Sequence, residues 1–185
     1  MTAGEELRSG LATGVDEHVT VTSTGQMRDL GRRLARVLRA GDLVILSGPL
    51  GAGKTTLAQG IGGGLGVRGP ITSPTFVIAR VHPSLGNGPD LVHADAYRLG
   101  SRAEVDDLDL DADLATSVTI VEWGEGLVEN LASSYLEVNI RAEAVGAEIG
   151  QGAAAPEEMP TDELETPRYV HLRGWGDRWA SVGPI

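Results

Sequence analysis

Residues 48–55, Gly48-Pro49-Leu50-Gly51-Ala52-Gly53-Lys54-Thr55, match the phosphate-binding loop pattern G-x-x-x-x-G-K-[ST] at every fixed position. The preceding run Leu43-Val44-Ile45-Leu46 is short, apolar and β-prone, which is typical of a buried parallel strand. After the loop, Leu57, Ile61 and Leu65 recur every four residues and predict one face of a helix. Glycines between a strand and a helix let backbone N–H groups and the helix N-terminus face a phosphate chain. The stretch therefore predicts a nucleoside triphosphate site.

Two side chains of this loop are expected to carry its chemistry. Lys54 should reach the β- and γ-phosphates, and the Thr55 hydroxyl should ligate Mg²⁺. The alternative is a glycine-rich turn that binds nothing, and the match of the loop together with both flanking elements disfavours it. The residues expected to bind the nucleotide are consecutive: Pro49, Leu50, Gly51, Ala52, Gly53, Lys54, Thr55 and Thr56.

Composition excludes several classes of protein. A chain of 185 residues that is 41% hydrophobic suits one domain with a central sheet covered by helices. The chain has no cysteine, which excludes disulfides and thiolate chemistry and favours a cytoplasmic location. No apolar run approaches a membrane span and the N-terminus lacks a signal-peptide core, so we expect no membrane partner. A net charge of −11 disfavours nucleic-acid binding unless a local basic patch overrides it.

One basic patch is predicted, on a helix over residues 23–40. Ser23 and Gln26 have the spacing of a capping box at its start, and its apolar residues share one face. Its opposite face carries four arginines: Arg28, Arg32, Arg36 and Arg39. We favour a solvated helix surface, as is usual for charge runs, over a docking face for RNA or an acidic partner.

The remaining pattern predicts strands and a hairpin. Short strands are expected at residues 19–21, 75–81, 91–95, 118–121, 136–140 and 169–172. The turn pair Asn87-Gly88 makes the second and third of them an antiparallel hairpin. Glycines concentrated between residues 60 and 64 predict that the C-terminal half of the helix after the loop is short or frayed.

Domain boundaries follow from composition. We expect one P-loop domain at residues 18–175, a flexible N-terminal tail at 1–17 and a C-terminal tail at 176–185. Residues 144–167 are rich in Ala, Gly, Glu and Pro without any basic residue, and predict a disordered insertion. A short helix opening at Ser101 should run into an acidic stretch up to residue 113, which lacks the glycine and final glutamate of a calcium loop.

Two carboxylates are predicted to complete the site. Asp95 and Glu122 end apolar strands, at the edge where an open α/β sheet binds its ligands. Such a carboxylate contacts the metal directly or through water, although a helix cap or surface group is the alternative for each. Ser73 and Thr75 lie on a proline-stiffened loop similar to an NTPase switch, which an ordinary turn would equally explain. The lone strand histidines are left out of the predicted site.

Four motifs in this order resemble the TsaE (YjeE) family, small bacterial ATPases required for threonylcarbamoyladenosine modification of tRNA. The motifs are L-G-A-G-K-T-T at 50–56, S-P-T-F at 73–76, H-x-D-x-Y-R-L at 93–99 and V-E-W at 121–123. The resemblance spans about residues 19–140. It implies a P-loop NTPase-like α/β fold in which a mixed β-sheet, parallel at its core with antiparallel strands added, is flanked by helices.

The resemblance also implies slow Mg²⁺-dependent ATP hydrolysis, activated by TsaB-like and TsaD-like partner proteins. tRNA would then be reached only indirectly, through their complex. By motif match, Lys54 and Thr55 bind phosphate and Mg²⁺, and Glu122 is the Mg²⁺-associated carboxylate. Asp95 is needed for hydrolysis, Trp123 lies beside the site, and Ser73 and Thr75 belong to the switch-like loop. A P-loop kinase of a small acceptor and a nucleotide-dependent binding module remain the alternatives.

Overall fold

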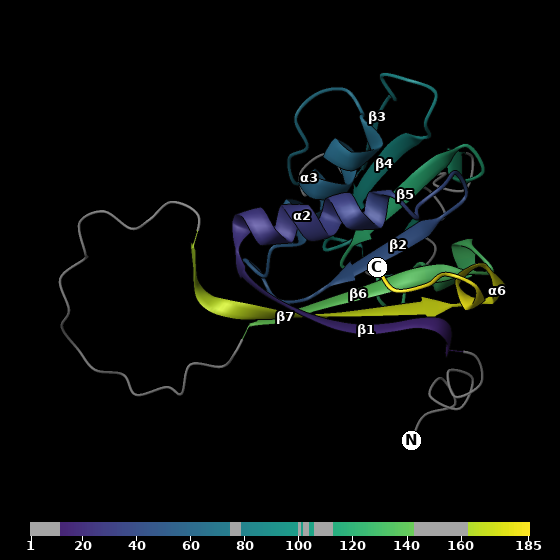
Figure 1. Cartoon of the computed structure of the whole chain (residues 1–185). Helices are drawn as coiled ribbons and strands as arrows, with labels where there is room; N and C mark the ends of the chain where they lie inside the picture. The colour runs from purple at the N-terminus through teal and green to yellow at the C-terminus, as the bar shows by residue number, and fades with distance from the viewer. Residues whose placement is uncertain (1–11, 75–78, 100, 102–103, 106–112, 143–162) are drawn as a thin grey trace.

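A seven-stranded mixed sheet forms the centre of the protein. The computed structural model describes residues 12–74, 79–99, 101, 104–105, 113–142 and 163–185. The strand order is β1-β7-β6-β2-β5-β4-β3. The strands are β1 (Ala12–Ser23), β2 (Leu43–Ser47), β3 (Ala79–His82), β4 (Asp90–Asp95), β5 (Ser117–Glu122), β6 (Tyr135–Ala142) and β7 (Glu163–Trp175). The helices are α2 (Thr24–Ala35), α3 (Lys54–Leu65), α6 (Asp177–Ala180) and the 3-10 turn η2 (Glu129–Leu131) (Figure 1).

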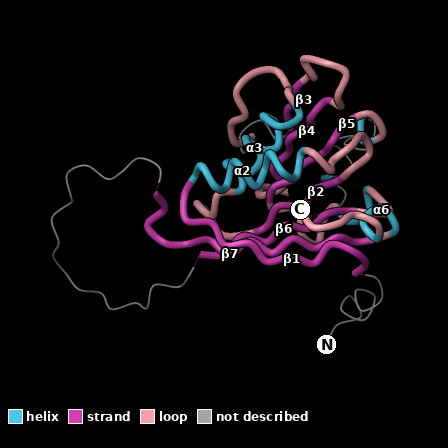
Figure 2. The backbone as a smooth tube through the Cα atoms, viewed as in Figure 1, coloured by secondary structure: helices cyan, strands magenta, loops and turns pink. Residues whose placement is uncertain are grey.

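The parallel and antiparallel parts of the sheet are separate. β2 runs parallel to both β6 and β5, and β5 runs parallel to β4. β3 pairs antiparallel with β4, and β7 pairs antiparallel with β6 and β1 (Figure 2). All five residues of β2 are buried, as expected for a central strand covered on both faces. The predicted mixed sheet and the predicted hairpin are therefore confirmed.

Close packing of α2 against α3 explains the glycines that follow the loop. The two helices lie side by side over one face of the sheet (Figure 1). A Cβ atom at Gly60 would lie 2.3 Å from the carbonyl oxygen of Arg28, and one at Gly64 would lie 2.5 Å from the Cβ of Ala35. The glycines thus let the helices approach, and α3 continues to Leu65. The prediction of a short or frayed helix was wrong, because it weighed local propensity without this packing.

The other face of the sheet has two different halves. Where this face is formed by β2, β5 and β4, apolar side chains cover it: Ile45 and Val121 of the strands pack with Val105 and Val128 from the connecting segments. Under β6, β7 and β1 the register places polar and aromatic side chains on this face, such as Asn139 beside His171. The site edge is thus built on the covered half, and a polar surface lies on the other.

Both ends of the described chain differ from the prediction. β1 begins at Ala12, so residues 12–17 belong to a strand beside β7 instead of a tail. β7 begins at Glu163, inside the predicted insertion, and runs to Trp175. Long β1–β7 pairing supplies the backbone hydrogen bonds that a tail would leave to water.

The C-terminal segment is packed rather than loose. Trp179 in α6 is fully buried, and burying a side chain of about 200 Å² contributes about 5 kcal/mol. The Arg178 guanidinium donates to both carboxylate oxygens of Asp42 at 2.9 Å and to the Val37 carbonyl at 2.6 Å. The expectation of a tail at 176–185 was therefore wrong, because composition does not show a single tryptophan anchor.

Several predicted features lie outside the described residues. They are residues 1–11, residues 144–162 of the insertion, the acidic run at 106–112, and Thr75. The strand predicted at 75–81 is described from Ala79 onward, as β3. Within the described part of the chain, no helix combines the length and the apolar character needed to cross a membrane.

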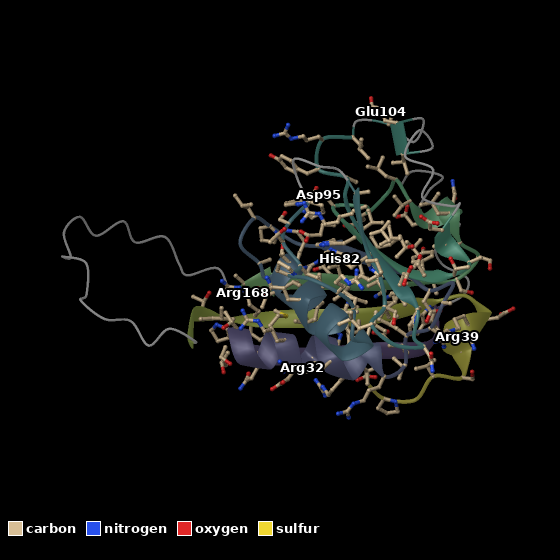
Figure 3. The ribbon with its side chains drawn as sticks, turned by 90° about the horizontal axis from the view of Figure 1, so that it is seen from above. Arg32, Arg39, His82, Asp95, Glu104 and Arg168 are labelled. Atoms are coloured by element: carbon tan, nitrogen blue, oxygen red, sulfur yellow. The ribbon has the colours of Figure 1, made fainter. Side chains whose placement is uncertain are left out.

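The predicted basic helix face is only partly formed. Ser23 caps α2 by accepting the Gln26 N–H at 3.1 Å, as its spacing predicted. The helix ends at Ala35, however, so Arg39 is not on it and lies beside α6, away from Arg32 (Figure 3). Arg28 turns inward and its Nε donates to Gln59. Arg32 and Arg36 remain exposed on the outer side of α2 and at its C-terminal cap.

Candidate nucleotide-binding site

The P-loop connects the end of β2 to the start of α3. Gly48, at φ 141°, passes so close to β6 that a Cβ atom would lie 2.3 Å from the carbonyl oxygen of Ile140. Gly53, at φ 107°, adopts the left-handed conformation that opens α3. A cavity of about 280 Å³ lies at this turn. Its lining residues come from the loop, the start of α3, the segment after α3 and the ends of β4 and β5: Leu50, Gly51, Ala52, Gly53, Lys54, Thr55, Thr56, Ser73, Asp95, Glu122 and Trp123.

Lys54 is the buried cation of this cavity. Its side chain folds back over the loop, where Nζ donates to the carbonyl oxygens of Gly48 at 2.8 Å and Pro49 at 3.0 Å. Nζ also lies 3.9 Å from the ring centroid of Trp123, a cation–π contact. Burial lowers the pKa of the Lys54 ammonium below its usual value, and the carboxylates of Glu122 and Asp95 partly offset that effect. The structure thus brings the cation together with the two carboxylates in one cavity.

Glu122 connects the loop to the sheet. It is the last residue of β5, and the strand register sets it beside Leu46 of β2 and Asp95 of β4. Its Oε1 accepts the Thr55 hydroxyl at 2.9 Å and lies 2.9 Å from Nε2 of His93. Since an ionised carboxylate only accepts, Nε2 of His93 carries the proton in this pair. Glu122 is 3% exposed, so these contacts form away from bulk water.

Asp95 lies at the same edge, at the end of β4. Its Oδ1 accepts the N–H of Tyr97 at 2.8 Å, the turn contact that fixes an aspartate side chain over the next residues. Asp95 is buried, and it lines the cavity together with the loop residues. From the sequence, Asp95 could instead be a helix cap or a surface group. The Tyr97 contact is turn-forming, but the burial and the cavity placement favour a site residue.

Trp123 follows Glu122 in an unusual conformation. Its φ is 61°, and it alone among the described non-glycine residues has a positive value. Such a conformation costs a bulky residue about 1–2 kcal/mol. Its N–H donates to the Leu46 carbonyl at 2.9 Å, and its ring packs at 5.2 Å from that of Tyr97 and beneath the Lys54 ammonium. Backbone strain maintained by such contacts is typical of functional sites.

The arrangement provides hard oxygen donors beside a cation. The oxygen atoms of the Thr55 hydroxyl and the Glu122 carboxylate lie 2.9 Å apart, and oxygen atoms are the ligands that Mg²⁺ prefers. Mg²⁺ is usually bound by one or two carboxylates together with substrate phosphates. The residues therefore fit a magnesium ion at this position. The predicted switch-like loop is brought to the cavity only by Ser73, since Thr75 lies outside the described residues.

Comparison with known proteins settles the family. The family model described as "Threonylcarbamoyl adenosine biosynthesis protein TsaE" matches residues 21–149. The chain belongs to the TsaE family. A Streptomyces coelicolor protein named tRNA threonylcarbamoyladenosine biosynthesis protein TsaE is 58% identical over 157 residues, which cover 84% of this chain and 95% of the relative. A Mycobacterium bovis protein of the same name is 49% identical over 140 residues, covering 72% and 82%.

A solved structure supports the fold independently. The crystal structure of YdiB from Bacillus subtilis superposes with a TM-score of 0.58 at 23% identity, covering 90% of this chain and 92% of that one. At that identity the likeness shows the fold alone, and it agrees with the mixed sheet described above. The resemblance to the TsaE family inferred from four short motifs is thus confirmed, and so is the fold class.

His93 is the site residue that sequence reasoning missed in this TsaE-family chain. It is fully buried and contacts Glu122, and its Nδ1 has no hydrogen-bond partner among the described atoms. As a lone strand histidine it is not expected in the site from the sequence. Its spacing from Asp95 was the available indication, since residues two apart in a strand share a face. Neither histidine lines the cavity itself, and His82 contacts the Arg68 carbonyl, whereas His93 contacts Glu122.

Proposed function

We propose that this chain is a Mg²⁺-dependent ATPase that serves threonylcarbamoyladenosine modification of tRNA in the cytoplasm. The observation that carries the proposal is the convergence of Lys54, Thr55, Asp95 and Glu122 on one cavity at the P-loop. Membership of the TsaE family supports the pathway. The chemistry is argued from the cavity itself.

Each side chain has a distinct part in binding or hydrolysis. Lys54 exchanges its two loop carbonyls for phosphate oxygens, which is favourable because phosphate is anionic and the carbonyls are not. Thr55 and Glu122 hold Mg²⁺, which neutralises charge on the phosphates when bound. His93 donates to Glu122 and keeps its carboxylate oriented toward Thr55.

Hydrolysis joins a water oxygen to the γ-phosphorus and breaks the bond to the bridging oxygen of ADP. ADP and inorganic phosphate are the products. Asp95 is the group that orients the attacking water, because its carboxylate lines the cavity and is fixed by the Tyr97 N–H. Ser73, on the switch-like loop, lines the same cavity and would contact the γ-phosphate in this proposal.

Partner proteins of the TsaB and TsaD type are part of the proposal, and tRNA is reached only through them. The chain carries a net charge of −11, and of the four predicted arginines only Arg32 and Arg36 lie exposed along and at the end of α2. Even if all four arginines contacted phosphates, the logarithm of the tRNA binding constant would fall with the logarithm of the salt concentration with a slope no steeper than about −4. We therefore expect weak tRNA binding by the isolated chain, and impaired assembly with partners when Arg32 and Arg36 are both changed to Glu.

One experiment separates this proposal from a small-molecule kinase. γ-Labelled ATP is supplied to the chain alone, and then with purified TsaB-like and TsaD-like proteins and tRNA. Release of inorganic phosphate, accelerated by the partners, is the expected result. Transfer of label to a stable small acceptor would support the kinase instead, and binding without turnover in the complete mixture would support a nucleotide-dependent binding module.

A further inference from the structure

A histidine pair and an aspartate lie together on the polar half of the sheet, apart from the P-loop cavity. His18 of β1 lies directly opposite His171 of β7 in the antiparallel register. Their rings stack with centroids 4.1 Å apart and planes 13° apart. Asp16, two residues before His18 on the same face of β1, has Oδ1 2.6 Å from Nε2 of His171. The cluster thus joins the first strand of the sheet to the strand beside it.

The three side chains offer the geometry of a three-ligand metal centre. One ligand atom from each of them lies within 4.8 Å of the other two. A tetrahedral Zn²⁺ with bonds of about 2.0–2.1 Å places its ligand atoms about 3.4 Å apart. The three ligand atoms thus lie within reach of one ion, provided that the two imidazoles, which now stack nearly parallel, rotate until their nitrogens converge. Two ligands at i and i+2 and a third on the neighbouring strand suit the flat, rigid surface of a sheet.

The surroundings leave room for a fourth ligand. A hollow of about 400 Å³ lies beside the histidine pair, lined by His18, Asn139, Arg141, Ala142, Tyr169 and His171. Three protein ligands with one open position is the pattern of zinc sites that bind water or a small ligand. In the hollow, Arg141 Nε donates to Asn139 at 2.8 Å, and its cationic side chain favours an anionic fourth ligand over a neutral one.

The donor atoms select the class of metal. Two imidazoles and one carboxylate suit Zn²⁺ and its transition-metal neighbours better than Mg²⁺ or Ca²⁺, which prefer oxygen ligands. Arg173 of β7 lies across from Asp16 in the strand register, so its positive charge weakens the binding of a metal cation beside Asp16. The site is open as well, since the side chains of Asp16 and His171 are 59% and 27% exposed. Both features favour moderate affinity.

We propose that Asp16, His18 and His171 form a binding site for a divalent transition metal of the Zn²⁺ class, with an open coordination position facing the hollow. The ion would fasten β1 to β7. The proposal does not depend on the ATPase, because neither strand contributes a residue to the P-loop cavity.

The test is zinc binding by the full chain in nucleotide-free, magnesium-free buffer, measured by equilibrium dialysis and repeated with Co²⁺ by visible absorption. We expect one Zn²⁺ per chain and a tetrahedral Co²⁺ spectrum. His171→Ala and His18→Ala should each weaken binding at least about tenfold, as loss of a ligand does more than loss of its supporting contact. Zinc should also raise the unfolding midpoint of the wild type and leave that of His171→Ala unchanged.

Two matched variants locate the ion. Thr20→Val changes an exposed residue two positions beyond His18 on the same strand, and Glu122→Gln changes the P-loop carboxylate. Both should bind zinc as the wild type does. Zinc affinity that is unchanged in His171→Ala, or lost in Glu122→Gln, would overturn the proposal. If an alanine variant fails to fold, zinc-induced NMR shifts in the wild type decide, because shifts absent from residues 16, 18 and 171 exclude the site.

Discussion

Replacing Glu122 by glutamine is the most direct test of the site. The amide has nearly the same shape, and its oxygen can still accept the Thr55 hydroxyl and the His93 N–H, which now lie 2.9 Å from the carboxylate. Only the negative charge is lost. The variant therefore separates charge from packing in a residue that is 3% exposed.

The size of the effect follows from those two hydrogen bonds. A hydrogen bond to a charged group contributes about 1.5–3 kcal/mol, against about 0.5–1.5 kcal/mol for a neutral one. Losing that difference twice costs about 2–3 kcal/mol. A neutral amide also holds Mg²⁺ less well, and the position of the metal matters chiefly in the transition state, so a loss of this size lowers kcat about 30- to 150-fold. ATP affinity should change little, because Lys54 and the loop backbone are untouched.

The assay is phosphate release at saturating ATP with the partner proteins present, paired with ATP binding by calorimetry at several Mg²⁺ concentrations. Glu125→Gln is the matched control, since Glu125 is exposed and three residues from the site, and it should leave kcat unchanged. Glu122→Gln weakens the same two hydrogen bonds in the folded protein, so its unfolding midpoint should fall, and a far-UV circular dichroism spectrum equal to that of the wild type at the assay temperature excludes a folding defect. A wild-type kcat in Glu122→Gln, or a loss seen only in ATP affinity, would refute the assigned role.

Three further predictions test other parts of the molecule. Lys54→Ala should remove most ATP affinity, because the buried ammonium is deleted, and calorimetry that shows wild-type affinity would exclude it from phosphate binding. Trp179→Ala should lower the free energy of unfolding by about 3–5 kcal/mol in urea titrations, whereas a loose C-terminal tail would give almost no change. Burial lowers the pKa of His82 below its usual 6.5 in the folded protein. As the pH falls, the imidazole is therefore protonated in the unfolded chain before it is protonated in the folded one. The free energy of unfolding should therefore decrease below about pH 6.5, and it should decrease less in His82→Gln than in the wild type. Identical pH profiles for the wild type and the variant would contradict this prediction.

The central sheet and the loop were predictable because their patterns are local. An apolar run, a glycine-rich turn and a helical repeat specify β2, the P-loop and α3 without reference to any distant residue. The same holds for the β3–β4 hairpin, whose turn residues are adjacent in sequence. The placement of Asp95 beside Glu122 followed from a general rule about strand ends.

The errors share one physical origin, which is contact between distant segments. Gly60 in isolation weakens a helix, yet against Arg28 it is what allows α2 to approach. Trp179 lies in a polar, glycine-bearing segment, but α6 packs against β1 and β7 and the side chain is completely buried. Neither partner is visible from the local sequence. The length of a strand also depends on its distant pairing partner. For that reason β1 and β7, which pair with each other, extend well beyond the short strands predicted from the local sequence.

His93 shows how a pattern can be correct and still be insufficient. Its spacing from Asp95 places both on one face of β4, but a function for His93 also requires that β5 be the parallel neighbour in this register. A shift of one residue would turn Glu122 to the opposite face and leave the imidazole against an apolar core. The hydrogen bond from His93 to Glu122 therefore depends on the β4–β5 register, and the loop depends in turn on Glu122 through Thr55. The sheet thus fixes the carboxylate from one side while the P-loop engages it from the other, and strand pairing becomes part of the geometry of the site.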